Sequence, residues 1–536
     1  MKHLFLLAGM VSVGLSTMVA EVPEPKTFSN TYFYAISPNG EWGVSQLISG
    51  IKVYNFVTGQ VDEYVDEMAY PTTGIGRPIS NNGVLVGSSD GLNAEIFVEG
   101  EWIGLDVPDY VMDGCCANSI TPDGKRICGS IGLSGVNLEE DALMQVPVIW
   151  NATEDGYGMP VRLPHPEFDI TGRAPQYCTA VDMSDDGKTI IGQVMTALGG
   201  FCYPIIYTED AEGNWSYDLV HPELYTIPGL EFPEYPGEGP QYPDPMEFMS
   251  ADSKEAYNES LQAWYDSNYT IEYPEYVDYM TDEEKAVFDA AMAEYNEEFD
   301  SWMADFNEWF DLYYQIVDSA PQAVFNSVRI APDAKTWAQT IEISDPDDFF
   351  GPKTFHTWVF ETGSDKIYKY TQTSDLNLTY LGNDGVAFAA TSLGTVSNSY
   401  VLKEGECDSM FYWLNKKFPK YANWMDENMR FTYEEYILNE ETWEYEGVLK
   451  EDALMTGRGV ATPDFSVVAL TVENVWDFMT EADAYLFDIE SAIAGVESVR
   501  PAVEGEKEIY DLSGRKLNSV SAPGIYIING KKQVVR

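Results

Sequence analysis

Apolar residues along this chain come in short runs of three to five, separated by turns of one recurring kind. Each turn reads as an apolar residue, then Ser, Thr or Ala, then Pro, Asn or Asp, a second Asn or Asp, and Gly, and a β-rich run follows it. Four clear and three weaker copies are Ile36–Gly40, Ile79–Gly83, Ile120–Gly124, Met183–Gly187, Ile330–Ala334, Leu381–Gly385 and Ala461–Phe465. Such self-similarity indicates that one supersecondary unit is used repeatedly.

Each copy has the residues of a tight hairpin turn. Pro presets φ for the turn, Asn or Asp tolerates the left-handed region, and Gly takes the position where φ is positive. The runs that follow are apolar or alternating, which is typical of sandwiched or half-buried strands. A further strand closes each unit, at Ile51–Tyr54, Glu95–Val98, Pro147–Trp150, Pro204–Tyr207, Thr357–Phe360, Ser399–Leu402 and Ala484–Asp488.

Three or four strands in every repeat, with about seven repeats, predict an all-β fold, a β-propeller of about seven blades. Radial closure leaves such a fold with only short, protected sheet edges. A β-sandwich or an irregular solenoid built from the same hairpins is the alternative.

A helical segment interrupts the repeats. Residues 226–245 are rich in Pro, Gly, Glu and Tyr, and from about 250 to 318 the period becomes helical. A capping box at Thr281–Glu284 opens the longer helix, which stops before Pro321. Its apolar residues recur at four-three spacing: Phe288, Met292, Tyr295, Phe299, Trp302, Phe306, Trp309 and Tyr313. A shorter helix with Tyr257, Leu261 and Trp264 precedes it, so we expect an inserted helical hairpin whose aromatic stripe packs on its partner helix or on the propeller, or faces a ligand.

A second insertion and two distinct chain ends complete the organisation. Within residues 404–451, Met410–Phe418 predicts a short amphipathic helix ended by Pro419. Residues 1–20 have the charged start, short apolar core and small residues of a signal peptide cleaved after Ala20. The expected domains are a signal peptide (1–20), a first propeller part of about four blades (21–245), a helical insertion (246–320), a second propeller part of about three blades (321–495) and a small C-terminal β domain (496–536).

These motifs resemble two kinds of known sequence. The repeated turns resemble the "SPDGK" repeats of WD40-like and TolB-type β-propellers and similar extracellular repeats, which implies blades and no particular activity. Residues 508–536, with "YDLSGRKL" and "GIYIINGKK", resemble the C-terminal sorting domains of the type IX secretion pathway of Bacteroidetes. This second resemblance implies an exported protein, located in the periplasm, on the outer-membrane surface or outside the cell.

Charge and hydropathy limit the classes of partner that the chain is expected to bind. The formal net charge of −58 argues against nucleic acid and anionic membranes, because both require a basic surface. Neutral sugars, cations, peptides or basic surfaces are the expected partners, although an acidic surface also serves solubility alone. The mature chain offers no run of eighteen apolar residues, so we do not expect an integral membrane protein. The sequence leaves the oligomeric state open.

Cysteines and candidate metal ligands give little chemistry. Six cysteines in an exported chain allow fifteen pairings, and Cys178 and Cys202, which flank one hairpin, are the candidate disulfide; free buried thiols are the alternative. No Cys-x-x-Cys pair predicts a metal site. The acidic run Ser344–Gly351 could offer oxygens to Ca²⁺, but it lacks the spacing of a dedicated loop, so we expect no cofactor.

Catalytic patterns are scarce, so we nominate no catalytic residue. The sequence carries no nucleophile elbow, zinc-protease motif, phosphate loop or dinucleotide fingerprint. The leading hypothesis is a non-enzymatic recognition propeller for glycan or protein partners at the cell surface. The alternative is a propeller glycoside hydrolase or polysaccharide lyase. Ligand contacts are expected from Trp302, Trp309 and Trp413, with the two insertions roofing one mouth of the central channel.

Overall fold

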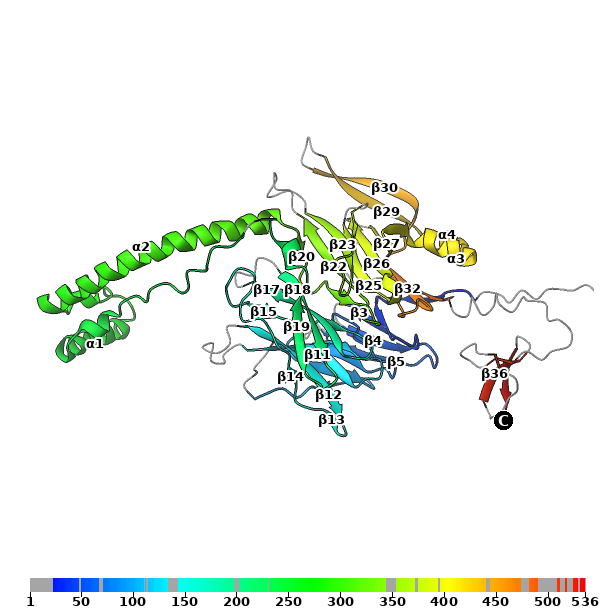
Figure 1. Cartoon of the computed structure of the whole chain (residues 1–536), viewed down its shortest axis with the longest axis horizontal. Coiled ribbons are helices and arrows are strands. Elements are labelled where there is room, and N and C mark those ends of the chain that lie inside the picture. The colour runs from blue at the N-terminus through cyan, green and yellow to red at the C-terminus, as the bar shows by residue number, and fades with distance from the viewer. Residues whose placement is uncertain are drawn as a thin grey trace, which may run out of the picture.

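The structure is a computed structural model dominated by antiparallel β-sheets that follow one another along the chain (Figure 1). It describes residues 23–489, except 48–49, 67–70, 110, 112–113, 134–142, 197–201, 230, 344–352, 372–374, 394–395, 440–443 and 474–481, together with four short strands between 509 and 535. The predicted signal peptide and the acidic run 344–351 lie outside these residues. No described helix is both long and apolar enough to cross a membrane.

The first half of the chain forms four units of sheet. The first contains β2 (Phe33–Ile36), β3 (Trp42–Leu47), β4 (Gly50–Asn55) and β5 (Val61–Val65), and the second β6 (Thr72–Thr73), β7 (Leu85–Ser88), β8 (Glu95–Val98) and β9 (Glu101–Gly104). The third contains β10 (Cys116–Ile120), β11 (Arg126–Gly132), β12 (Gln145–Thr153), β13 (Gly156–Tyr157) and β14 (Val161–Arg162). The fourth contains β15 (Tyr177–Cys178), β16 (Asp182–Met183), β17 (Thr189–Met195), β18 (Cys202–Glu209) and β19 (Trp215–Leu219).

The second half adds three such units. They comprise β20 (Gln322–Ala323), β21 (Arg329–Ile330), β22 (Thr336–Ile343), β23 (Thr354–Glu361) and β24 (Ile367–Tyr370); then β25 (Leu376–Leu381), β26 (Ala387–Leu393), β27 (Val396–Lys403) and β28 (Glu406–Ser409); then β31 (Arg458–Ala461), β32 (Val467–Glu473) and β33 (Ala482–Asp488). The third and fourth units are joined by a single parallel pair, Gln145 with Tyr177. The fold is a β-propeller, as predicted, and the count of seven blades stays a prediction because this pair merges two units into one sheet.

The chain ends of the propeller close its last sheet. Strand β1 (Lys26–Ser29) pairs antiparallel with β33, more than 450 residues later, and supplies the outer strand that the last unit lacks. The Phe33 amide also donates to Thr471 Oγ1 at 3.1 Å. Closure in this way satisfies backbone groups that would otherwise form an open sheet edge.

The repeated turns have one hydrogen-bond pattern. In the first copy the Gly40 amide donates to Ser37 O at 2.8 Å, the Ser37 hydroxyl donates to Asn39 Oδ1 at 2.7 Å, and the Trp42 amide donates back to Ser37 Oγ at 2.9 Å. The same three bonds recur with Ser80, Thr121, Ser184 and Thr462 as the hydroxyl residue, except that the Ser80 hydroxyl is met by the Val84 amide one residue earlier. In these five copies the motif therefore fixes the hairpin through its own side chains.

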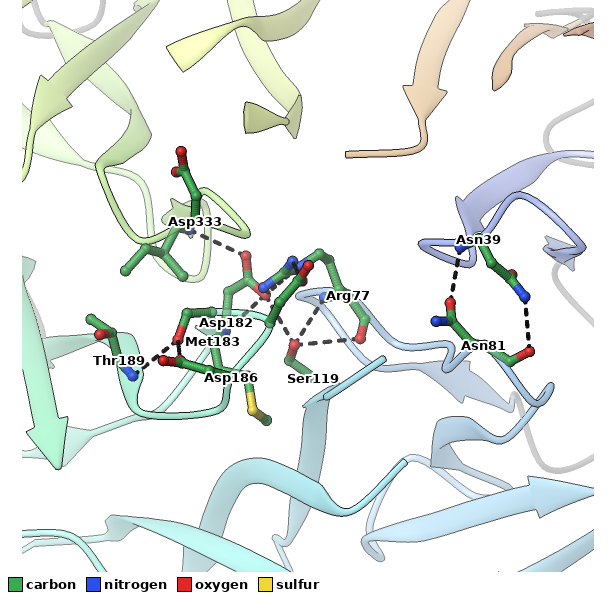
Figure 2. Close-up of polar contacts among 12 residues, drawn as sticks. Asn39, Arg77, Asn81, Ser119, Asp182, Met183, Asp186, Thr189 and Asp333 are labelled. Carbon is green, nitrogen blue, oxygen red and sulfur yellow. Dashed lines mark hydrogen bonds and ion pairs between the residues drawn. The ribbon is translucent and has the colours of Figure 1, made fainter. Parts of the chain in front are cut away.

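Neighbouring turns are also bonded to each other. The Asn39 amide donates to Asn81 Oδ1 at 2.9 Å (Figure 2), and the Asn81 amide donates in turn to Pro122 O at 2.9 Å. Two further links join Asp185 N to Pro332 O and Asn383 N to Pro463 O. The turns thus connect consecutive units as well as the two strands of each unit.

The turn glycines lie against the preceding unit. Gly187 has φ +66°, and a Cβ on it would lie 2.8 Å from Arg126 Cδ and 2.9 Å from Thr121 Cγ2. In two weaker copies the corresponding residues are Ala334, with φ +59°, and Phe465, with φ +61°. The turn geometry therefore persists where the sequence match fails, at the cost of a strained backbone.

The helical insertion is an arm that extends away from the sheets (Figure 1). It contains α1 (Ala251–Asp266) and the 38-residue α2 (Asp282–Ser319), with the short turns η1 (Pro222–Tyr225), η2 (Pro245–Phe248) and η3 (Tyr276–Asp278) around them. The predicted capping box is confirmed: Thr281 Oγ1 accepts from the Glu284 amide and Glu284 Oε2 accepts from the Thr281 amide. At about 1.5 Å per residue, α2 is about 57 Å long.

The aromatic stripe of α2 has three different covers. Phe288, near its first turns, packs in a small cluster with Tyr257 of α1. In the middle, Trp302 Nε1 donates to Gly237 O at 3.0 Å, so the extended Pro-rich segment covers the helix. At the end, Trp309 and Tyr313 belong to the largest core cluster of the propeller. The stripe is thus buried at both ends, by α1 and by the propeller, and half-buried in the middle, under the Pro-rich segment.

The second insertion differs from the prediction in one respect. Helix α3 (Met410–Lys417) is confirmed, but Pro419 begins a second helix, α4 (Pro419–Asn428), because the first helical position needs no amide hydrogen. Strands β29 (Arg430–Asn439) and β30 (Glu444–Leu454) then form a two-stranded ribbon. At the C-terminus, β34 (Ile509–Tyr510), β35 (Lys516–Leu517), β36 (Gly524–Ile528) and β37 (Lys531–Val535) form a small sheet in the order β35-β34-β36-β37.

The candidate disulfide between Cys178 and Cys202 is wrong. Both thiols are free, because β17 lies between their strands: Cys178 pairs with Val194 and Cys202 with Met195. Two strand spacings separate the cysteines by roughly 9–10 Å, beyond the reach of a disulfide. The Cys202 thiol instead donates to Ala323 O at 2.9 Å. Burial raises the pKa of each thiol to about 12.

A glycine substitution tests the packing of the turns. Gly187→Ala should lower the free energy of unfolding by about 2–4 kcal/mol, because left-handed strain adds to overpacking against Arg126 and Thr121. The control is Gly213→Ala, where φ is +87° but no atom lies within 4 Å of the added Cβ, and it should cost only about 1–2 kcal/mol. Equal losses of urea stability in the two variants would contradict the packing role.

Thiol titration tests the correction. Without reductant, a thiol-reactive disulfide reagent should find six free thiols in denaturant. In the native protein Cys128, Cys178 and Cys202 should react slowest, because all three are buried and protonated, and the half-buried Cys116 and Cys407 fastest. Four thiols in denaturant, rising to six only after reduction, would restore a disulfide.

Candidate functional site

The inner strands of the propeller meet around a small cavity at its axis. The space inside amounts to about 30 Å³. It is lined by Tyr34, Ala35, Ile36, Ile75, Gly76, Arg77, Asp182, Arg329, Thr379, Tyr380, Leu381 and Arg458. These residues come from β2, β16, β21, β25, β31 and the segment before β7, that is, from six of the units.

Asp182 is the central polar residue of this site. Its side chain is 2% exposed. Oδ1 accepts from the Ser119 hydroxyl at 3.0 Å and from the Met183 amide at 2.9 Å, and Oδ2 accepts from the Ile330 amide at 3.2 Å (Figure 2). With Arg77 Nε at 3.4 Å from Oδ1, one carboxylate holds residues of four consecutive units.

Arg77 connects this carboxylate to a second one. Its Nη1 donates to Asp185 Oδ1 at 2.7 Å, and its side chain is 13% exposed. Burial alone would lower the pKa of Arg77, but the charges of Asp182 and Asp185 outweigh it and the pKa is raised. Arg77 is therefore a paired cation that fixes the second unit against the fourth.

Arg329 and Arg458 bring two more cations to the cavity. Arg329 Nη1 donates to the backbone oxygens of Asn326 and Val328 at 3.0 and 2.7 Å. Arg458 Nη1 donates to the Tyr32 hydroxyl at 3.0 Å, and its guanidinium lies 5.1 Å from the ring centre of Tyr34. Arg329 is thus held by neutral backbone groups, which leaves its charge available to a third party.

Tyr380 adds a neutral donor. Its hydroxyl oxygen is buried and has no hydrogen-bond partner among the described residues. Burial raises its pKa well above the usual range, and the nearby charge of Arg77 only partly opposes this. The hydroxyl therefore stays protonated at physiological pH and can donate to a bound group.

The structure does not bring the three predicted ligand-binding tryptophans together. Trp309 is fully buried in the propeller core, where its Nε1 donates to Thr171 O at 2.9 Å. Trp302 lies on the Pro-rich segment of the arm, and Trp413 packs near Phe388 and Phe465. The arm extends outward, so the two insertions do not form a common roof (Figure 1). Ligand binding by these three side chains stays a prediction.

The axial residues carry a signal that the sequence analysis missed. Ser119, Asp182, Arg329 and Tyr380 each stand immediately before the first residue of a turn motif. The register of the repeats therefore places them at equivalent positions on their inner strands. A search for polar residues at that one position would have found the site.

Metal sites are not evident. Among the residues that the structure describes, no group of three or more His, Cys, Asp and Glu side chains could hold a metal ion.

Comparison with known proteins finds only solved structures of low sequence identity. No family model matches the chain, and no curated protein matches it. Among solved structures, hydrazine synthase from Kuenenia stuttgartiensis is 11% identical with a TM-score of 0.38, and 85% of this chain and 95% of that one are covered. A putative TolB from Agrobacterium tumefaciens is 9% identical with a TM-score of 0.31, and the match covers 68% of this chain and 89% of that one. The β-propeller domain of the Trilobed protease from Pyrococcus furiosus is 8% identical with a TM-score of 0.27, and the match covers 85% of this chain and 95% of that one. These values transfer no function.

Substitution of Asp182 tests its role as the axial link. Asp182→Ala should lower the free energy of unfolding by about 3–5 kcal/mol, because it leaves Arg77 and three other donors without their buried acceptor. The control Asp185→Ala removes the 41% exposed partner of Arg77 and should cost about 1 kcal/mol or less. Similar losses in thermal unfolding would show that Asp182 is not the link.

Proposed function

We propose that this chain is an exported, non-catalytic recognition propeller that binds a glycan or protein partner at the cell surface. The observation that carries the proposal is the axial cavity, where residues from six units converge on one small space. A concave site with a few convergent polar groups on a rigid frame is the usual form of a ligand site. The hydrogen bonds of Asp182 to neighbouring units supply that rigidity.

Export to the surface is proposed from the two chain ends. Residues 1–20 have the pattern of a signal peptide, and residues 508–536 resemble type IX sorting domains. The small sheet of β34 to β37 is compatible with a separate sorting unit. Both features concern the address of the protein and are independent of the axial cavity.

The enzymatic alternative, a glycoside hydrolase or polysaccharide lyase, has less support at this site. Glycoside hydrolysis commonly uses two carboxyl groups, one as the acid and one as the base or nucleophile. Among the described residues that line the cavity, Asp182 is the one carboxylate, and both its oxygens already accept hydrogen bonds. Those bonds suit a structural role better than proton transfer.

Binding and turnover should be measured on the same protein. Glycan and peptide arrays identify a partner, and Tyr380→Phe should then weaken its affinity about 2- to 10-fold, because one hydrogen bond is lost. Tyr242→Phe, at an exposed tyrosine of the Pro-rich segment, is the matched control and should leave the affinity unchanged. Cleavage of any bound glycan by the unmodified protein would overturn the non-catalytic proposal. Equal affinities of the two variants would show that the partner does not bind at the axial cavity.

A further inference from the structure

The axial cavity is cationic in a chain that is strongly acidic. The sequence has 30 Lys and Arg against 88 Asp and Glu, yet three arginines and one aspartate line this cavity. Even with Asp185 counted as the second partner of Arg77, one positive charge is left over. A cluster of positive charge in so acidic a chain needs a local explanation. Pairing with Asp182 and Asp185 explains the presence of Arg77 but not that of the other two arginines.

Arg329 is the cation without a counter-charge. No carboxylate among the described residues pairs with it, and only its Nη1 has hydrogen-bond partners, two backbone oxygens. The other nitrogens, Nε and Nη2, have no partner in the part of the chain that the structure describes. Burial, together with the like charge of Arg458, lowers the pKa of Arg329, and attraction to Tyr34 and Asp182 only partly offsets this. An anion in the cavity would relieve both effects.

The neighbouring donors suit the same ligand. Arg458 is held against Tyr32 and Tyr34 in the same lining, and the buried Tyr380 hydroxyl lacks a partner. Buried donors of this kind normally have a partner, either in the protein, in water or in a ligand. Two arginines and one tyrosine hydroxyl in the lining of one space form a donor set for oxygen anions.

The size of the cavity limits the anion. About 30 Å³ is room for two or three water-sized groups and no more. A carboxylate fits that room and matches the planar fork of a guanidinium. A doubly charged phosphate is larger and would lie beside Asp182 and Asp185, whose charges oppose it.

We propose that the axial cavity binds a carboxylate group, with Arg329 as the principal donor and Arg458 and Tyr380 as further donors. This rests on the proposed function and deepens it, because it names the chemical group of the partner that enters the site. The carboxylate belongs either to a free small acid or to an acidic sugar, and the same donors would recognise both.

The experiment measures how a carboxylate changes the stability of the full chain. Acetate is added in chloride-free buffer, replacing fluoride at constant ionic strength, and the unfolding temperature is followed. The unmodified protein should show a saturable rise with acetate and none with acetamide, the neutral molecule of the same shape. Arg329→Gln should abolish the rise, whereas Arg162→Gln, at an exposed position of β14, should retain it.

The readout is the acetate-dependent shift, so it stays informative if a variant is less stable. If Arg329→Gln does not fold, Arg458→Gln takes its place, and line broadening of ¹³C-acetate by the unmodified protein measures binding directly. The expected loss of acetate affinity is at least about tenfold for either variant. Equal acetate shifts in Arg329→Gln and Arg162→Gln would overturn the proposal, as would tighter binding of inorganic phosphate than of acetate.

Two further arms separate the sources and the proposals. Glucuronate binding more tightly than acetate, with glucose not binding, would assign the carboxylate to a sugar acid; equal affinities would assign it to a free small acid. A partner found on the arrays that binds undiminished in excess acetate would overturn the carboxylate assignment while leaving the recognition function intact. Turnover would overturn the recognition function while leaving anion binding to be judged by the acetate shifts.

Discussion

The buried carboxylate of Asp182 is the interaction on which the arrangement of the propeller axis depends. It accepts hydrogen bonds from residues of the second, third and fifth units while standing on the fourth. A fully buried charge is costly unless every lone pair is engaged, and here the donors are backbone amides, a hydroxyl and a guanidinium. Each donor is fixed by its own sheet, so the carboxylate is satisfied only when all four units are in place. The hydrogen bonds of this one carboxylate therefore depend on the correct arrangement of four consecutive units.

The cost of burying charge also distinguishes two arginines at the cavity. Arg77 is compensated by Asp182 and Asp185, but Arg329 is held by backbone oxygens alone. Dipoles of two carbonyls stabilise a guanidinium less than a carboxylate does. A site that carries a half-buried cation without a paired carboxylate gives up stability in the unliganded protein, and such a loss is common where binding requires it.

Much of the fold could be predicted from the sequence because its elements are local. The turns, the closing strands and the capping box at Thr281 depend on residues within a few positions of each other, and all are found. The predicted disulfide is wrong because β17 separates the two cysteines, and the spacing of residues along the sequence does not reveal the order of strands within a sheet. The axial site was missed for a different reason: Arg77, Asp182 and Arg329 are far apart in the chain, and the signal that relates Asp182 to Arg329 is their shared position before a turn motif, which only a comparison of the repeats shows. The start of α4 at Pro419 shows that a residue read as a stop also serves as a start.

The arm illustrates how one periodic pattern can serve several environments. The four-three spacing of aromatic residues predicted a buried seam but could not identify what covers it. Near the propeller, Trp309 and Tyr313 complete the main core, so this end cannot be removed without opening that core. Further out, Gly239 lets the Pro-rich segment approach the ring of Trp302, where an added Cβ would lie at 3.3 Å. A proline-rich strand needs no regular hydrogen bonds to stay extended, which makes it an effective cover for a single long helix. The arm is therefore anchored in the propeller core at one end, and beyond it the Pro-rich segment and α1 take over the burial of the stripe.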